Sequence, residues 1–337
     1  MKKVTLHDVA KAANVSVATA SWAINDKNKS RIPESTRIKV RETAEQLGYF
    51  PNALAKSLVD RKSKLIGFVT DDVATSPFAG EIIKGAQEEA WKNGSLLLIV
   101  NTEGKEDIEK QALDMLIEYQ VKGVIYSTWY HHSITTPKLL ERTDAVLVNC
   151  FDPQNNYISV IPNEFQGGKA ATETLIKCKH HRIAFINTNK KSPAQEYRLK
   201  GYKKALENYS LKFDPSLVIY TDPTQKGGFK VTDEIIQSKA TAVFCHNDRV
   251  AMGLYDGLKE KGISIPEDIS IIGFDNQKII SENLYPELTS VALPHYELGV
   301  RGVRELLKLN DCVGEHPDSK SIYIDTPIIK RQSIKSL

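Results

Sequence analysis

Two pairs of adjacent histidines, His131-His132 and His180-His181, are the side chains that first suggest chemistry in this sequence, namely metal binding. Adjacent residues on a strand point to opposite faces, so the two members of a pair do not converge on one ion. We find no acidic or cysteine partner at ligand spacing, whereas a structural zinc ion needs four ligands. We therefore expect no metal site.

The four cysteines are spread too widely to form a metal site or a disulfide framework. None belongs to a Cys-x-x-Cys pair, which favours reduced thiols and a cytoplasmic protein. Lys2 and Lys3 open the chain, but no apolar segment follows, so we expect no secretory signal. No run of 18 apolar residues is present, so we expect no membrane span. The cysteines are Cys150, Cys178, Cys245 and Cys312.

Motifs for phosphate binding or nucleophilic catalysis are missing from the sequence. Gly167-Gly168 and Gly227-Gly228 lie in neither a GxGxxG nor a GxxxxGK[ST] pattern, so we interpret them as helix starts. No GxSxG motif is found. We expect a protein that is not an enzyme and needs no cofactor.

Charge is distributed unevenly along the chain. The 45 basic and 42 acidic residues give a net charge of +3, but residues 1–62 alone carry +6 and the remainder carries −3. A basic head on a slightly acidic body suggests that the first sixty residues meet a polyanion such as nucleic acid. A solvated basic surface is the plainer alternative.

The pattern of predicted helices and strands changes at the same boundary between the basic head and the body. Residues 1–50 contain no strand-like run and predict three short helices, whereas residues 64–330 alternate short apolar runs with amphipathic helical stretches. Such alternation predicts parallel sheets covered on both faces. About 270 residues are too many for one such sheet, so we expect two α/β lobes with a ligand site between them.

The head has the signals of a helix-turn-helix. Thr5 can cap a first helix, Asn14 suits a tight turn, and Ser16 can cap a second helix over Val17–Asn25. Two short helices joined by a short turn form this DNA-binding pattern. A third helix is predicted with Pro33 in its first turn and its end at Gly48.

Three segments of the head, 4–21, 34–37 and 47–58, resemble the headpiece of the LacI/GalR family of repressors. The resemblance continues along nearly the whole chain. It implies an all-α helix-turn-helix headpiece at 1–50 and a hinge helix and linker at 51–63. It also implies a periplasmic-binding-protein-like core at 64–337, made of two doubly wound parallel-sheet lobes. The N-lobe would hold 64–162 and 292–323, and the C-lobe 163–291 and 324–337.

The family places the second helix in the major groove of double-stranded operator DNA. Matching positions put Val17, Ala18 and Trp22 nearest the base edges, where the family commonly has polar residues. Apolar side chains offer mainly contact with a thymine methyl, so the operator sequence is in doubt, and Trp22 could instead belong to the core. The residues that would contact the DNA backbone are Thr5, Ser16, Thr19, Ser21 and Asn25.

Residues 52–58 resemble the hinge helix of the family, which folds in the minor groove. Leu58 matches the leucine that wedges between base steps, Ala55 the small residue beside it, and Asn52 opens the segment. A linker helix with Leu58 against the body is the alternative. Since one headpiece covers a half-site, the resemblance implies a homodimer on a near-palindromic operator.

The resemblance also implies an effector site between the lobes. A carboxylate, amides, a guanidinium and an aromatic platform together suit a polyol. Some members could only cap helices, Asp248 above all, because it opens a helix. The implied effector residues are Phe78, Asn149, Arg198, Asn247, Asp248 and Asp275.

Function follows from these expectations. The chain should cross between the lobes near 161–163, 291–294 and 323–326, and rotation there would let an effector change operator affinity. We expect a repressor of a carbohydrate-utilisation operon controlled by a small sugar. The alternatives are the same regulator sensing a purine, a nucleoside or a partner protein, and, more remotely, a solute-binding protein.

Overall fold

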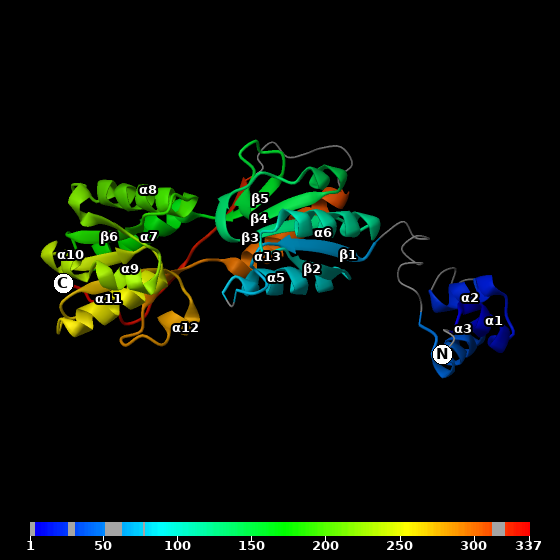
Figure 1. Ribbon diagram of the computed structural model, residues 1–337. Helices are drawn as coiled ribbons and strands as arrows, with labels where there is room; N and C mark the ends of the chain where they lie inside the picture. Colours follow the sequence, from blue (N-terminus) through cyan, green and yellow to red (C-terminus); the bar gives the residue numbers. More distant parts are fainter. Residues whose placement is uncertain (1–3, 26–30, 51–62, 77, 312–320) are drawn as a thin grey trace. The chain divides into compact units, whose positions relative to one another are not determined.

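The computed structural model describes residues 4–25, 31–50, 63–76, 78–311 and 321–337. The chain forms two compact units, Met1–Ser63 and Lys64–Leu337 (Figure 1). Among the described helices, none is both long and apolar enough to span a bilayer.

The first unit is a three-helix headpiece. Its helices are α1 (Leu6–Ala13), α2 (Val17–Ile24) and α3 (Glu34–Gln46). Small side chains allow the helices to approach closely, and Val9 and Val40 fill the space between them without any exposed surface. Arg41 ties α3 to α2 because its Nε donates to the carbonyl of Ala23 at 3.2 Å. The buried cluster is Val9, Ala10, Ala13, Ala20, Ala23, Val40 and Ala44.

The predicted helix signals are present in this headpiece, with two shifts. Thr5 and Asp8 form a capping box, Asn14 has the left-handed φ of 56°, and Ser16 accepts from the amide of Thr19. The first shift is at Pro33, which precedes α3 as its N-cap instead of lying in its first turn. The ring fixes φ near −65°, but the observed ψ of 144° is extended, so the helix starts one residue later. The second shift is that α2 ends at Ile24.

The second unit contains two six-stranded sheets, which define the N-lobe and the C-lobe. The N-lobe sheet is entirely parallel, in the order β11-β5-β4-β3-β1-β2. Its strands are β1 (Leu65–Thr70), β2 (Leu96–Asn101), β3 (Val124–Ser133), β4 (Ala145–Phe151), β5 (Ile158–Pro162) and β11 (Ser321–Ile324).

The C-lobe sheet has the order β12-β10-β9-β8-β6-β7. It is parallel except for β12, which pairs antiparallel with β10 at the edge. Its strands are β6 (Ile183–Thr188), β7 (Val218–Thr221), β8 (Ala242–Cys245), β9 (Ser270–Asp275), β10 (Thr289–Ala292) and β12 (Ile328–Ile329).

Helices cover both faces of each sheet, as the near-continuous apolar strands require. In the N-lobe α5 (Gly80–Lys92) and α13 (His295–Asp311) cover one face, and α6 (Glu106–Glu118) and the 3-10 turn Lys138–Arg142 cover the other. The C-lobe helices are α7 (Glu164–Lys177), α8 (Pro193–Asn208), α9 (Gln225–Lys230), α10 (Thr232–Gln237), α11 (Asp248–Glu260) and α12 (Lys278–Ser281), with a 3-10 turn at Pro215–Leu217.

Three chain segments connect the lobes. The chain passes from β5 to α7, from β10 to α13, and from β11 to β12 (Figure 1). The segments are joined to each other, since the amide of Asn163 donates to Ile324 at 2.9 Å and the amide of Ala292 donates to Pro327 at 2.8 Å. The three connections therefore form one hydrogen-bonded joint.

The close packing of α5 on α13 gives a test of the N-lobe. A Cβ added at Gly85 would lie 2.1 Å from the carbonyl oxygen of Tyr296, whereas one added at Gly80 meets nothing within 4 Å. We expect Gly85→Ala to lower the free energy of unfolding by about 2 kcal/mol or more, because backbone must move apart. Gly80→Ala, in the same helix, is the control. Equal melting temperatures for the two variants would contradict this packing.

Candidate functional site

The start of the second helix of the headpiece is exposed. Ser16, Val17 and Ala18 are exposed, and Val17 exposes 43% of its surface. Trp22 is half-buried and lies outside the buried cluster of the described headpiece.

The polar residues predicted for the headpiece surface also cap the ends of its first two helices. The hydroxyls of Ser16 and Thr19 are 2.8 Å apart, and the amide nitrogen of Asn25 donates to the carbonyl of Ser21 at 3.0 Å. Thr5 donates to the carboxylate of Asp8. The three predicted hinge residues, Asn52, Ala55 and Leu58, lie outside the described residues.

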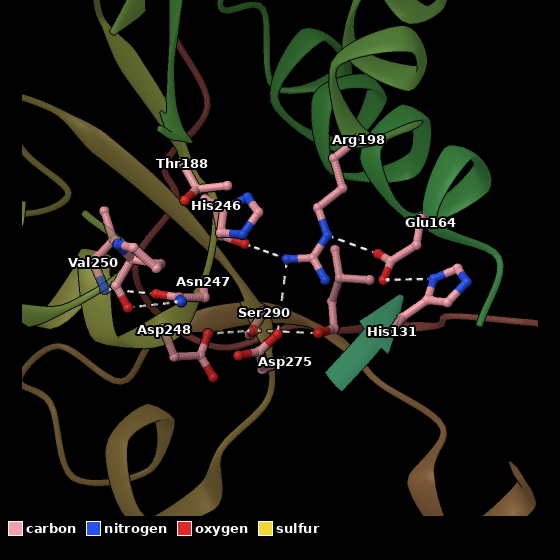
Figure 2. A network of polar contacts seen from close by, with 12 residues as sticks. His131, Glu164, Thr188, Arg198, His246, Asn247, Asp248, Val250, Asp275 and Ser290 are labelled. Atoms are coloured by element: carbon pink, nitrogen blue, oxygen red, sulfur yellow. Dashed lines mark hydrogen bonds and ion pairs between the residues drawn. The ribbon is translucent and has the colours of Figure 1, made fainter. Parts of the chain in front are cut away.

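In the second unit, a buried arginine organises the polar residues between the lobes (Figure 2). Arg198, on α8, is 3% exposed. Its Nε donates to Oε2 of Glu164 at 2.7 Å, and its Nη1 donates to the carbonyl of His246 and lies 3.8 Å from Oδ1 of Asp275. Its guanidinium carbon lies 3.5 Å from the ring centroid of Phe274, at stacking distance. We call this set, with His131, the interlobe site.

Electrostatics differ sharply between the two carboxylates of the interlobe site. Burial alone raises the pKa of Glu164, but the charge and the hydrogen bond of Arg198, together with the nearby imidazole of His131, outweigh it and hold the pKa at about 2. Burial raises the pKa of Asp275 to about 6, against the lowering effect of Arg198 and of the hydrogen bond from Gln277. Glu164 is thus the permanent counter-ion of Arg198, whereas Asp275 loses its charge as the pH falls through about 6.

Asn247 and Asp248 lie beside the interlobe site, and their side chains are engaged by the protein. Oδ1 of Asn247 caps α11 by accepting from the amide of Val250 at 2.8 Å. Asp248 has no exposed surface. Its two oxygens each accept a 2.6 Å hydrogen bond, from the hydroxyl of Ser290 and the amide of Gln277. In this structure Asp248 therefore positions the loop after β9.

Asn149 and Phe78 come from the N-lobe. Asn149 is 2% exposed, has a φ of 60°, and donates its side-chain amide to the carbonyl of Thr128 at 2.9 Å. This bond fixes the ends of β3 and β4. Phe78 is half-buried and packs against the imidazole of His295, with ring centroids 4.4 Å apart.

Sequence reasoning missed three members of the site: Glu164, His131 and His246. Glu164 directly follows a predicted lobe crossing, which was the available signal for it. His131 was weighed only as a metal ligand, whereas its Nδ1 lies 3.6 Å from Oε1 of Glu164. His246 precedes the recognised Asn247, and its carbonyl rather than its ring contacts Arg198.

Several buried polar atoms near the site have no hydrogen-bond partner. They are both ring nitrogens of His131, Nδ1 of His246 and Nε of Arg249. Buried polar groups are almost always satisfied, and exceptions need an explanation such as a bound molecule. These atoms could accept or donate to a ligand with several polar groups.

The raised pKa of Asp275 leads to a prediction on stability. The folded state binds this proton more tightly than the unfolded chain does, so stability falls as the pH rises from about 4 to about 6 and stays lower above it. Asp275→Asn removes that cost. We expect it to stabilise the ligand-free protein at pH 8 by on the order of 2 kcal/mol, and not at pH 4. Urea unfolding at the two pH values measures this, and an equal effect at both would contradict it.

The chain matches two known families in succession. Residues 5–52 match the bacterial regulatory proteins of the lacI family, and residues 172–334 match a periplasmic binding protein-like domain. Catabolite control protein A of Priestia megaterium is 32% identical, over 98% of this chain and 99% of that protein. The transcriptional repressor CytR of Escherichia coli K12 is also 32% identical, over 99% of this chain and 97% of that protein.

Solved structures show the same architecture. The lac repressor dimer bound to operator and the anti-inducer ONPF has a TM-score of 0.81 and 25% identity, covering 99% of this chain and 100% of that one. The complex of the regulator CelR with cellobiose has a TM-score of 0.65 and 25% identity, covering 98% of this chain and 100% of that one.

Proposed function

Because the chain belongs to the lacI family of bacterial regulatory proteins, and is therefore a DNA-binding transcription regulator, we propose that it represses a carbohydrate-utilisation operon under the control of a small sugar. It would act in the cytoplasm, where the operator lies. The observation that carries the sugar proposal is the interlobe site, in which a buried guanidinium lies between two carboxylates.

The chemistry of that site suits a polyol. Hydroxyl groups both donate and accept, so they can bond a carboxylate such as Asp275 and a guanidinium such as Arg198 at once. Nε2 of His131 and Nδ1 of His246, which accept or donate no hydrogen bond within the protein, would bond further hydroxyls. Phe78 offers an aromatic face for the apolar side of a sugar ring.

Operator binding would use a homodimer. One headpiece reaches a single half-site, and a two-fold pair of headpieces reads a near-palindromic operator. A solved relative, the lac repressor, is a dimer bound to operator. Val17, Ala18 and Trp22 would face the bases, with Thr5, Ser16, Thr19, Ser21 and Asn25 toward the phosphates. Sugar binding would change operator affinity by rotating the lobes about their three connections.

A nucleoside effector is the second candidate, because an aromatic pair lies close to the interlobe site. Trp129 and Tyr130 are exposed at the end of β3, with ring centroids 5.1 Å apart. His131, the next residue, faces Glu164. Exposed aromatic rings stack well on a nucleobase as well as on a sugar.

Calorimetry of the full chain with a panel of monosaccharides, disaccharides and nucleosides tests the effector class. We expect one sugar to bind. Arg198→Gln should lower the affinity for that sugar at least about tenfold, because a buried charge-assisted hydrogen bond is lost. Lys200→Gln, an exposed change on the same helix, should bind like the wild type. Binding of a nucleoside and of no sugar would contradict the sugar proposal and support the second candidate.

Leu58→Ala tests the wedge proposed from the family resemblance. Without the leucine we expect specific operator affinity to fall at least about tenfold, since the kink that brings further contacts is lost. Sugar binding measured by calorimetry should stay unchanged. Unaltered operator affinity in a gel-shift titration would contradict the wedge.

A further inference from the structure

We infer that Glu164 is a positioning residue that couples Arg198 to the angle between the lobes. One oxygen of its carboxylate holds the arginine in the C-lobe, and the other faces His131 of the N-lobe (Figure 2). This inference rests on the proposed function in one respect, namely that Arg198 binds the effector. The link across the lobes stands on its own geometry.

The two contacts of Glu164 differ in kind. The contact with Arg198 lies within one rigid body, because α7 and α8 pack so closely that a Cβ on Gly168 would lie 2.5 Å from the carbonyl oxygen of Arg198. A Cβ on Gly201 would likewise lie 2.3 Å from the carbonyl oxygen of Phe165. Lobe rotation therefore leaves Glu164 and Arg198 together.

The contact with His131 crosses between lobes and would change with their angle. Oε1 of Glu164 lies 3.6 Å from Nδ1 of His131, and both side chains are at most 5% exposed. Glu164 is the first residue of α7, directly after a lobe connection, and Asn163 caps that helix by accepting from the amide of Gln166 at 3.1 Å. The carboxylate of Glu164 therefore lies directly beside one of the connections about which the lobes would rotate.

A bulge in β3 directs His131 toward Glu164. The β3–β4 pairing shifts between Ser127 and His132, which pair with Val148 and Cys150. Extra residues in one strand re-aim its side chains. Two bonds fix the bulge: the amide of Trp129 donates to Oδ1 of Asp71 at 2.9 Å, and the hydroxyl of Thr128 donates to the carbonyl of Tyr130 at 2.9 Å.

The contact joins the imidazole of His131 to the carboxylate of Glu164, so a glutamine in either position alters it. The other titratable groups that act on Glu164 are Arg198, Asp275, His246 and His295. Burial lowers the pKa of His295 to about 4 and that of His246 well below its ordinary value, so neither gains a charge between pH 5 and 8. On the strand of His131 itself, His132 stacks on Tyr130 and interacts with Asp71.

Trp129 provides a probe two residues from His131. In the full chain with Trp22→Phe and Trp91→Phe, it is the only tryptophan. Its emission maximum is recorded at neutral pH without any effector, so the result does not depend on the sugar proposal. Glu164→Gln and His131→Gln are compared with Glu173→Gln, a change of the same type on the same helix.

We expect Glu164→Gln and His131→Gln to shift the emission maximum of Trp129 in the same direction, because either change removes the same contact between the lobes. Glu173→Gln should leave the emission maximum at the wild-type value. A fold-stabilising role alone would lower the melting temperature and leave the emission maximum in place, so an unmoved maximum in Glu164→Gln overturns the inference. If Glu164→Gln does not fold, a wild-type maximum in His131→Gln overturns it.

The effect on the effector is measured separately, with the sugar that binds in the calorimetric panel. We expect Glu164→Gln to lower the affinity for that sugar at least about fivefold, since Arg198 loses the hydrogen bond that orients it. Glu173→Gln should have no effect. If no sugar binds at all, the proposed effector is wrong, but the fluorescence result still decides whether Glu164 links the lobes. Unchanged sugar affinity in Glu164→Gln would contradict its role in positioning Arg198.

Discussion

The cost of burying the guanidinium of Arg198 governs how the second unit is arranged. A charge removed from water must be compensated by an opposite charge and by hydrogen bonds, or the fold loses several kcal/mol. Glu164 supplies the charge, the carbonyl of His246 supplies a further acceptor, and Phe274 covers the guanidinium face. These partners come from the start of α7, the end of β8 and the end of β9, so one side chain ties together three elements of the C-lobe.

The ion pair between Arg198 and Glu164 depends on close packing of two helices. Arg198 can reach Glu164 only because α7 and α8 approach at Gly168 and Gly201, where no Cβ fits. Asp248 plays a similar part on the opposite side, since it is buried and holds Ser290 and the amide of Gln277. Burial and the neighbouring Asp275 raise its pKa well above the ordinary value. In a ligand site built in this way, the C-lobe residues keep fixed positions relative to one another. Only their distances to residues of the N-lobe can change.

Local signals were predictable from the sequence, and long-range pairings were not. The cap at Thr5 and the left-handed Asn14 depend on a few adjacent residues, and the alternating pattern was enough to predict two lobes with parallel sheets. Arg198, Asp275 and the lobe crossings were named through a family resemblance. Their partners Glu164 and His131 were missed because each contact spans more than thirty residues and depends on how helices and a bulge pack. The antiparallel β12 was missed for the same reason, since two residues carry no periodicity.

The three connections between the lobes also bear on how the chain is assembled during synthesis. The N-lobe sheet is completed by β11, which lies more than 150 residues after its neighbour β5. A ribosome therefore synthesises most of the C-lobe, from α7 to β10, before the N-lobe can close its edge. Until then β5 offers an unpaired strand edge, which is a ready template for aggregation. Closure of the N-lobe is slow and non-local because neither lobe is a continuous piece of chain.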